Sequence, residues 1–398
     1  MPANPTFAPA PSHYALRMWL FFAGYILIGG VYVPFFPVWL AARGLTETEI
    51  AACIALPMAI KVFATPFGGV LADLVGNRRL AVQAFTGVAA FIFLFAWPVR
   101  SYAPLLLITA AAAVVSGMAL PVVEALALTG VRRYGLDYGR MRFGGSVAFV
   151  VANLASGLLL GIIAPDKLFF LFLGAMLVAA ATSVVLPVVP AGSDGETTRP
   201  AARSAWRVLG NPSFLALVFV GGLIQASHAV LYSFGSIHWQ SLGFGGAAIG
   251  AFWAIGVVSE IVVFMYSGFA IRAFGPAGLI LIGGLAAAVR WVALPFDLGL
   301  AGFAASQVLH GLTFGAVYLG NQHAIARAVP EELTGSAQGV FAMVQGTLLA
   351  GSTALAGPLY SVYGAAAFRF MLVPVGLALV ILLAYERLRR RKVPRANR

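Results

Sequence analysis

Long apolar stretches separated by short polar breaks dominate the chain. An α-helix needs about 20 apolar residues to cross the ~30 Å hydrocarbon layer of a bilayer. Stretches of about this length recur along the whole sequence, and they predict an all-α membrane protein with twelve transmembrane helices. We expect the spans near residues 17–40, 48–71, 80–98, 104–130, 142–163, 167–188, 213–237, 246–270, 277–296, 301–325, 334–358 and 365–386.

The composition agrees with this pattern. Hydrophobic residues make up 61% of the 398 residues, charged residues only 10%, and the mean hydropathy is +0.93. Soluble domains have about 45–50% apolar and about 25% charged residues, so a water-soluble fold is excluded. The one cysteine, Cys53, excludes an intramolecular disulfide and a metal site built from several cysteines.

Basic residues are distributed unequally between the two ends of the spans. One set of ends carries 19 of them and the opposite set only four, Arg43, Arg100, Lys167 and Arg369. The positive-inside rule therefore predicts that both termini are cytoplasmic, in a multi-pass protein of the inner membrane. The segment Met1–His13 lacks the basic start and cleavage site of a signal peptide, so we expect a cytoplasmic tail. The net charge of +12 follows this topology, and no nucleic-acid partner is expected.

The chain divides into two similar halves. Its longest polar break, Pro190–Asn211, lies in the middle and contains glycine, serine and arginine, as expected for a flexible linker. An offset of 199 residues aligns Gly44 with Gly243, Gly69 with Gly268 and Gly76 with Gly275. We therefore predict two pseudo-symmetric six-helix bundles. The expected parts are a cytoplasmic tail 1–16, bundles 17–189 and 212–386, a cytoplasmic linker 190–211 and a basic cytoplasmic tail 387–398.

The loop after the second span carries a recognisable motif. It reads Gly69-Val-Leu-Ala-Asp73-Leu-Val-Gly76-Asn-Arg78-Arg79, with a degenerate copy at Gly268, Arg272 and Gly275. The glycines permit close helix approach and a tight turn, Asp73 can pair locally, and the arginines hold the loop in the cytoplasm. This segment resembles the signature loop of the major facilitator superfamily, which implies a transporter fold.

A closer resemblance lies in two further segments. These are Val31–Leu40 and Leu136–Phe149, and they are similar to the phenylpropionate permease family, which is related to the lactose permease and the nucleoside–proton symporters. The stretches around Gln225–His228 and Gly256–Glu260 fit the same family. The resemblance implies a monomeric secondary transporter for a small molecule.

Ionisable residues inside the spans cost about 2.5–3.5 kcal/mol each on insertion scales and mark candidate sites. Glu124 and Arg142 are equidistant from position 133, so an antiparallel hairpin places them at one depth. Their 18-residue spacing, with Phe149 two turns further, resembles the substrate-binding pair and stacking aromatic residue of the lactose permease. The alternative is a structural ion pair that holds the hairpin together.

The second half contains a three-residue layer. Glu260 and Arg290 are equidistant from position 275, and Arg290 and His310 from position 300, so all three are predicted at one depth. Burial and a nearby guanidinium act in opposite directions on the proton affinity of a carboxylate, and histidine can relay a proton. The Arg-to-His spacing resembles the lactose permease, in which a carboxylate lies one turn beyond the histidine. Thr313 occupies that place here, so we expect Glu260, with His310, to carry the proton. The alternative is a salt bridge without titration.

Three more residues are candidates for substrate binding. Lys61 lies near the membrane centre, in pseudo-symmetry with Glu260, and is expected to bind an anionic group or to pair with Glu124 or Glu260. Gln225 and His228 share a helix face with Tyr232 and could bind substrate or close an outer gate. For polar residues on such helices, packing against a neighbouring helix is the alternative.

These features together favour a secondary active transporter that works by alternating access. Together with the buried basic residues, the resemblance implies proton-coupled symport of a small organic anion, an aromatic carboxylate such as 3-phenylpropionate, moved inward with protons. Lys61, Arg142 and Arg290 would hold the carboxylate. The chain lacks the Gly-x-x-x-x-Gly-Lys phosphate-binding loop, so a proton gradient rather than ATP or a cofactor is expected to drive it. Its partners would be the substrate, protons and membrane lipids.

The sequence is also compatible with other functions. One is proton-coupled symport of a sugar or nucleoside, with Glu124 and Arg142 hydrogen-bonding hydroxyl groups. Another is drug or metabolite efflux by proton antiport. A membrane-embedded enzyme or receptor is least favoured, because no nucleophile–base pair and no metal-ligand set is evident.

Overall fold

The computed structural model describes residues 8–188, 208–330 and 333–392, and within these ranges it contains helices joined by turns and loops, without strands. Most of the predicted linker 190–211 lies outside the described residues, as do residues 1–7 of the predicted N-terminal tail and residues 393–398 of the basic tail.

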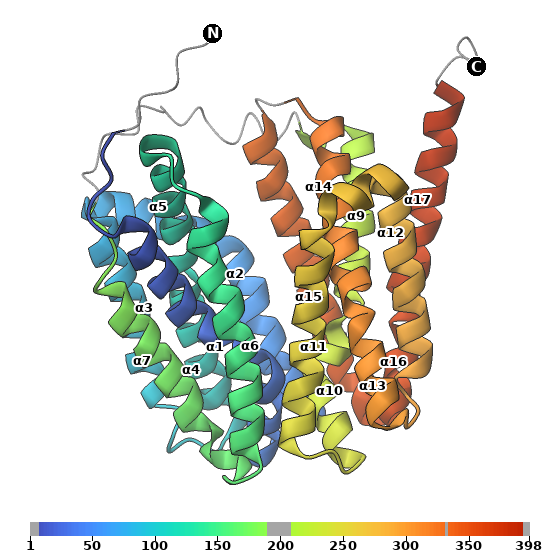
Figure 1. Ribbon diagram of the computed structural model, residues 1–398. Coiled ribbons are helices and arrows are strands. Elements are labelled where there is room, and N and C mark those ends of the chain that lie inside the picture. The colour runs from blue at the N-terminus through green and yellow to red at the C-terminus, as the bar shows by residue number, and fades with distance from the viewer. Residues whose placement is uncertain (1–7, 189–207, 331–332, 393–398) are drawn as a thin grey trace. The chain divides into compact units, whose positions relative to one another are not determined.

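The helices follow the predicted spans closely (Figure 1). The first half contains α1 (Tyr14–Ala42), α2 (Glu47–Val75), α3 (Arg78–Leu94), α4 (Tyr102–Gly117), α5 (Ala119–Tyr134), α6 (Tyr138–Leu160), the 3₁₀ turn η1 (Pro165–Lys167) and α7 (Leu168–Ser183). The second half contains α9 (Pro212–Ala226), α10 (Ala229–Ser241), α11 (Gly246–Met265), α12 (Ser267–Ala293), α13 (Gly299–Val308), the π-helix η2 (Gly311–Ala316), α14 (Val317–Ala328), α15 (Thr334–Tyr363), the 3₁₀ turn η4 (Gly364–Ala366), α16 (Ala367–Phe370) and α17 (Leu372–Lys392).

Ten helical stretches of the described chain are long and apolar enough to cross a membrane. One of them, Ser336–Arg389, spans 54 residues and contains both α15 and α17, which the sequence predicts as two spans. The predicted third span corresponds to α3, which has 17 residues. Each of the twelve predicted spans is therefore represented by helix, and the all-α, multi-pass architecture is confirmed.

Several predicted spans are interrupted, which the sequence pattern did not reveal. The fourth span is divided into α4 and α5 at Met118, and the seventh into α9 and α10 at Ser227 and His228. The tenth span changes from α-helix to π-helix between α13 and α14. Because apolar periodicity is unchanged by a single distorted turn, hydropathy alone cannot locate such breaks.

The chain forms two compact units. Among the described residues, unit 1 contains residues 8–45, 63–188 and 245–250, and unit 2 contains residues 46–62, 208–244, 251–330 and 333–392. The sequence predicts that the chain divides at the linker. The observed units differ from this division in two places: residues 46–62 belong to unit 2, and residues 245–250 belong to unit 1.

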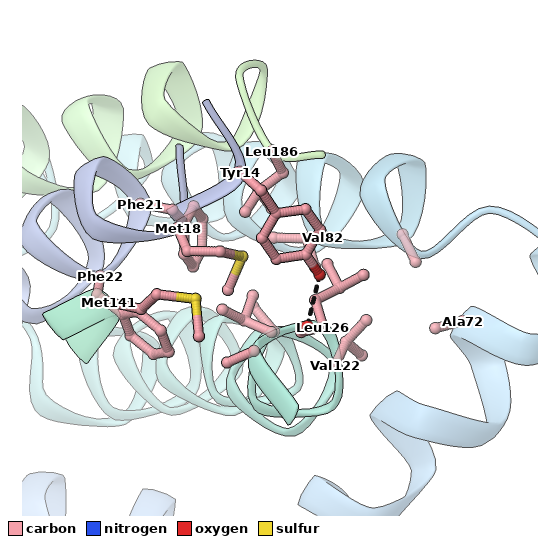
Figure 2. Close-up of a cluster of buried hydrophobic side chains, with 14 residues drawn as sticks. Tyr14, Met18, Phe21, Phe22, Ala72, Val82, Val122, Leu126, Met141 and Leu186 are labelled. Carbon is pink, nitrogen blue, oxygen red and sulfur yellow. Dashed lines mark hydrogen bonds between the residues drawn. The ribbon is translucent and has the colours of Figure 1, made fainter. Parts of the chain in front are cut away.

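A buried apolar cluster holds one end of unit 1 together (Figure 2). Tyr14, Met18, Phe21 and Phe22 of α1 pack against α5, and the hydroxyl of Tyr14 donates a 2.6 Å hydrogen bond to the carbonyl oxygen of Leu126. This bond satisfies a buried phenol where no water is available. The cluster therefore fixes α1 against α5 through both apolar contact and a polar anchor.

Four glycines have positive φ values at places related by the 199-residue offset. Gly44 and Gly243 have φ values of 84° and 86°, and Gly76 and Gly275 have φ values of 68° and 65°. Side chains other than glycine adopt this region at a cost of about 1–2 kcal/mol, so both halves use glycine at equivalent turns. The matching geometry supports the predicted duplication.

Arg43 joins three loops at one end of unit 1. Its guanidinium forms an ion pair with Asp166 and donates hydrogen bonds to the carbonyl oxygens of Trp97, at 2.8 Å, and Val99, at 2.9 Å. The ammonium of Lys167 lies 5.0 Å from the centre of the Trp97 ring. The sequence assigns four basic residues to the less positive side. Three of them lie around Trp97 and Asp166, and these are Arg43, Arg100 and Lys167.

Candidate functional site

A buried arginine lies at the centre of a polar cluster in unit 2. Arg290, on α12, is 0% exposed. Its Nη1 donates to Nδ1 of His310 at 3.2 Å and to Oγ1 of Thr313 at 3.0 Å. Its Nη2 donates to Oε1 of Gln307 at 3.2 Å. The predicted pairing of Arg290 with His310 across two helices is therefore present.

Glu260 joins the cluster through His310. A carboxylate oxygen of Glu260 lies 3.0 Å from Nε2 of His310. Because a guanidinium can only donate, Nδ1 of His310 accepts from Arg290, and the neutral ring carries its hydrogen on Nε2. His310 thus donates to Glu260 and links it to Arg290. The predicted layer of Glu260, Arg290 and His310 is confirmed as one connected set of contacts.

His228 closes the other end of the network. Its Nδ1 lies 3.2 Å from the carbonyl oxygens of both Ile224 and Gln225, which makes Nδ1 the protonated nitrogen. Its Nε2 then accepts the 3.0 Å hydrogen bond from the hydroxyl of Thr313. His228 is 0% exposed, so in this structure both ring nitrogens are used within the bundle.

Two helix irregularities bring these residues together. His228 lies at the break between α9 and α10, and Thr313 lies in the π-helix that follows α13. A π-turn adds a residue to the turn and is frequent at functional sites. Gly311 allows close approach here, because a Cβ at this position would lie 2.6 Å from the carbonyl oxygen of Ser259. Its backbone NH donates to the hydroxyl of Ser259 at 2.8 Å. The missing side chain of Gly311 therefore permits α11 and the π-helix to approach each other beside Glu260.

The electrostatic arrangement of the cluster is unusual for a buried arginine. Within the described chain, no carboxylate lies within ion-pair distance of Arg290, and its nearest anionic link is Glu260 through the ring of His310. Separated buried charges are costly unless they are hydrogen-bonded and compensated. The charge of Arg290 therefore depends on a carboxylate that it does not touch.

Unit 1 contains a second charged pair, on α5 and α6. Nη1 of Arg142 lies 3.0 Å from Oε1 of Glu124, as the hairpin geometry predicts. The hydroxyl of Tyr138 donates to Oε2 of Glu124 at 2.7 Å, and the Arg142 guanidinium lies 5.4 Å from the ring centre of Phe22. The side chains of Arg142 and Glu124 are 39% and 28% exposed, so this pair is more open than the cluster in unit 2.

The remaining candidates occupy different environments. Phe149 packs beside Gly29 of α1, where a methyl group on the glycine would lie 3.5 Å from the ring. The side-chain amide of Gln225 donates to the carbonyl oxygen of Phe314 at 3.4 Å, so Gln225 faces the π-helix. Lys61, on α2, is half-buried and forms neither an ion pair nor a hydrogen bond with any residue that the structure describes.

The signature loop forms a tight turn between α2 and α3. Gly76 supplies the left-handed turn, and the side chain of Asn77 caps α3 by accepting from the backbone NH of Leu80. Asp73 forms a long ion pair with Arg78, at 3.9 Å. A Cβ at Gly69 would meet no described atom within 4 Å, so the close helix approach predicted at this glycine is wrong. Arg79 is half-buried in the first turn of α3. The local pairing predicted for Asp73 is present.

Tyr138 was not identified from the sequence as a member of these sites. Tyr138 lies four residues before Arg142 on α6, so helical spacing alone could have placed both on one face. Gln307, at the end of α13, is a polar residue expected either to bind substrate or to pack against a neighbouring helix, and it contacts Arg290 of α12. Within the described residues, no group of three or more His, Cys, Asp or Glu side chains could hold a metal ion.

Comparison with known proteins identifies the family. Residues 13–371 match the MFS_1 like family. A probable 3-phenylpropionic acid transporter of Escherichia coli (strain K12) is 29% identical over 367 residues, which cover 90% of this chain and 93% of that protein. A maltose permease of Geobacillus stearothermophilus is 28% identical over 318 residues, with 79% of each chain covered.

A solved structure shares the fold. The crystal structure of the nucleoside transporter NupG has a TM-score of 0.81 at 16% identity and covers 96% of this chain and 100% of its own. This similarity shows that the two chains share a fold. Three observations agree: the match over residues 13–371, the signature loop and the all-helical multi-pass fold. The chain belongs to the MFS_1 like family, whose similar members are membrane transporters and not enzymes.

Proposed function

We propose that the protein is a proton-coupled symporter of a small organic anion, an aromatic monocarboxylate of the 3-phenylpropionate kind, that works by alternating access in the inner membrane with both termini in the cytoplasm. The observation that carries the proposal is the contact of His310 with both Glu260 and Arg290. The relative named as a probable 3-phenylpropionic acid transporter supports the choice of substrate.

The cluster suggests how a proton and an anion are coupled. When Glu260 takes up a proton, its negative charge disappears and Arg290 remains without compensation. A positive charge in a low-dielectric interior attracts an anion strongly. A carboxylate substrate therefore binds better to the protonated protein, and substrate release favours loss of the proton by linkage.

His310 acts in this scheme as a connector. Its Nδ1 accepts from Arg290, so a charged imidazolium could form only if that hydrogen bond were broken. We therefore assign the transported proton to Glu260, and we assign to His310 the role of transmitting the change in charge to Arg290.

The basic residues divide into two groups by accessibility. Arg290 is fully buried, so in this conformation it attracts the substrate electrostatically without touching it. Lys61 has no anionic partner among the described residues, and Arg142 is partly exposed beside Glu124. We propose that Lys61, which belongs to unit 2 like Arg290, contacts the carboxylate of the substrate.

The test is uptake into proteoliposomes. Labelled 3-phenylpropionate should accumulate when an inward proton gradient is imposed and should only equilibrate without it. Maltose and uridine, supplied under the same gradient, address the second candidate function, proton-coupled symport of a sugar or nucleoside. The names of two similar proteins and the polar Glu124–Arg142–Tyr138 set favour that alternative. Accumulation of either neutral compound, without the acid, would replace the proposal.

A further inference from the structure

Two grooves flank the last turns of α17 in unit 2. The first has a volume of about 470 Å³ and lies among α9, α12, α14 and α17, lined by Arg327, Arg389, Glu386, Tyr385 and apolar side chains that include Phe274 and Leu383. The second, of about 520 Å³, lies between α9 and α17 and shares Tyr385 and Arg389 with the first. Both grooves are lined by residues from the first turns of α9 and the last turns of α17, and the first groove also by residues near the end of α14. Figure 1 shows the course of these helices.

The charged side chains of the first groove leave a net positive charge. Arg389 pairs with Glu386 at 3.0 Å, whereas Arg327 has no partner among the described residues. Two arginines against one glutamate give the lining a charge of +1. The exposed guanidinium of Arg327 is thus available to an anion from outside the protein.

Apolar side chains continue from the grooves along α17. Val373, Leu377 and Val380 are 69%, 51% and 64% exposed, and Leu388, beside Arg389, is 58% exposed. Their spacing of three, four and eight residues places them on one side of the helix. An occupant that matches this surface has an anionic head at the arginines and an apolar chain along α17.

We propose that the grooves bind an anionic phospholipid, with its phosphate between Arg327 and Arg389 and an acyl chain along the exposed side of α17. Basic pockets between transmembrane helices are suited to such headgroups. A soluble phosphate compound would use the arginines but not the apolar surface. The proposal depends only on the membrane location of the protein and is independent of its substrate.

The experiment measures retention of lipid by the full-length protein purified in detergent. Native mass spectrometry would compare phosphatidylglycerol with phosphatidylcholine, and glycerol 3-phosphate would be added as a competitor. We expect selective retention of phosphatidylglycerol, resistant to the competitor. Removing both arginines (R327Q with R389Q) should lower this retention by at least about fivefold per arginine.

Three further variants make the result specific. R369Q removes an exposed arginine elsewhere in unit 2, one that stacks on Phe296, and should retain the lipid as the natural protein does. R327K with R389K keeps both charges and should restore most of the retention. E386Q frees Arg389 and should increase retention. Equal retention of the two lipids, no effect of R327Q with R389Q, or displacement by glycerol 3-phosphate would overturn the proposal.

Discussion

Nε2 of His310 lies 3.0 Å from a carboxylate oxygen of Glu260, while Nδ1 of the same ring accepts from Arg290 at 3.2 Å. One imidazole therefore separates two opposite charges that do not touch. A directly paired carboxylate and guanidinium would neutralise each other at short range. Because the imidazole of His310 lies between them, Glu260 can gain or lose a proton without breaking a bidentate pair with Arg290.

Glu260→Gln should uncouple transport from the proton gradient. Glutamine keeps the size and can still accept from His310, but it cannot release a proton. We expect gradient-driven accumulation of labelled 3-phenylpropionate to be lost and exchange of internal for external substrate to persist. Glu49→Gln, at the exposed start of α2, serves as the matched control and should accumulate substrate normally. Accumulation by Glu260→Gln at the natural level would exclude Glu260 as the proton carrier.

Thr313→Val should weaken the network around Arg290. Valine has a similar shape but neither accepts from Arg290 nor donates to His228, so two buried groups lose a partner. The expected loss of stability is about 1–3 kcal/mol per unsatisfied group. Thermal unfolding of the purified protein measures it, and Thr313→Ser should recover most of the loss. A natural unfolding temperature for Thr313→Val would show that the hydrogen bonds of Thr313 contribute little.

Lys61→Gln should raise the KM for an aromatic carboxylate. A hydrogen bond to a charged group contributes about 1.5–3 kcal/mol, which corresponds to roughly 10–150-fold in affinity. Initial rates of uptake at several substrate concentrations measure the change. Lys61→Arg keeps the charge and should retain much of the affinity. If Lys61→Gln has the natural KM, the carboxylate of the substrate binds elsewhere.

Arg43→Gln should destabilise unit 1. The guanidinium is buried and holds Asp166 together with the carbonyl oxygens of Trp97 and Val99, so its removal leaves a carboxylate without its closest cation. Breaking a fully buried pair costs about 3–5 kcal/mol. Because Asp166 is 29% exposed and keeps Arg100 at 3.5 Å, we expect a smaller loss, about 1–3 kcal/mol. Thermal unfolding of Arg43→Gln, with the exposed Arg100→Gln as control, tests this. Similar unfolding temperatures for the two variants would contradict the structural role of Arg43.

Much of the architecture could be predicted because the bilayer imposes simple rules. A helix must be apolar over about 20 residues, and antiparallel neighbours bring residues equidistant from a turn to one depth. These rules were enough to pair Glu124 with Arg142 and to place Glu260 beside His310. The 199-residue repeat was also visible in the sequence, since equivalent turns require glycine at Gly76 and Gly275.

Only the tertiary structure decided how the charged residues are used. Depth does not specify rotation about a helix axis, so the sequence could not show that Arg290 is sealed while Arg142 is partly exposed. Nor could it show the π-helix that brings Thr313 between Arg290 and His228. The sequence by itself determined the spans and the charged residues that share a layer, because these follow from distance along the chain, and it predicted the repeat. Which side chains contact one another depended on helix distortion and packing, which arise only when distant segments meet.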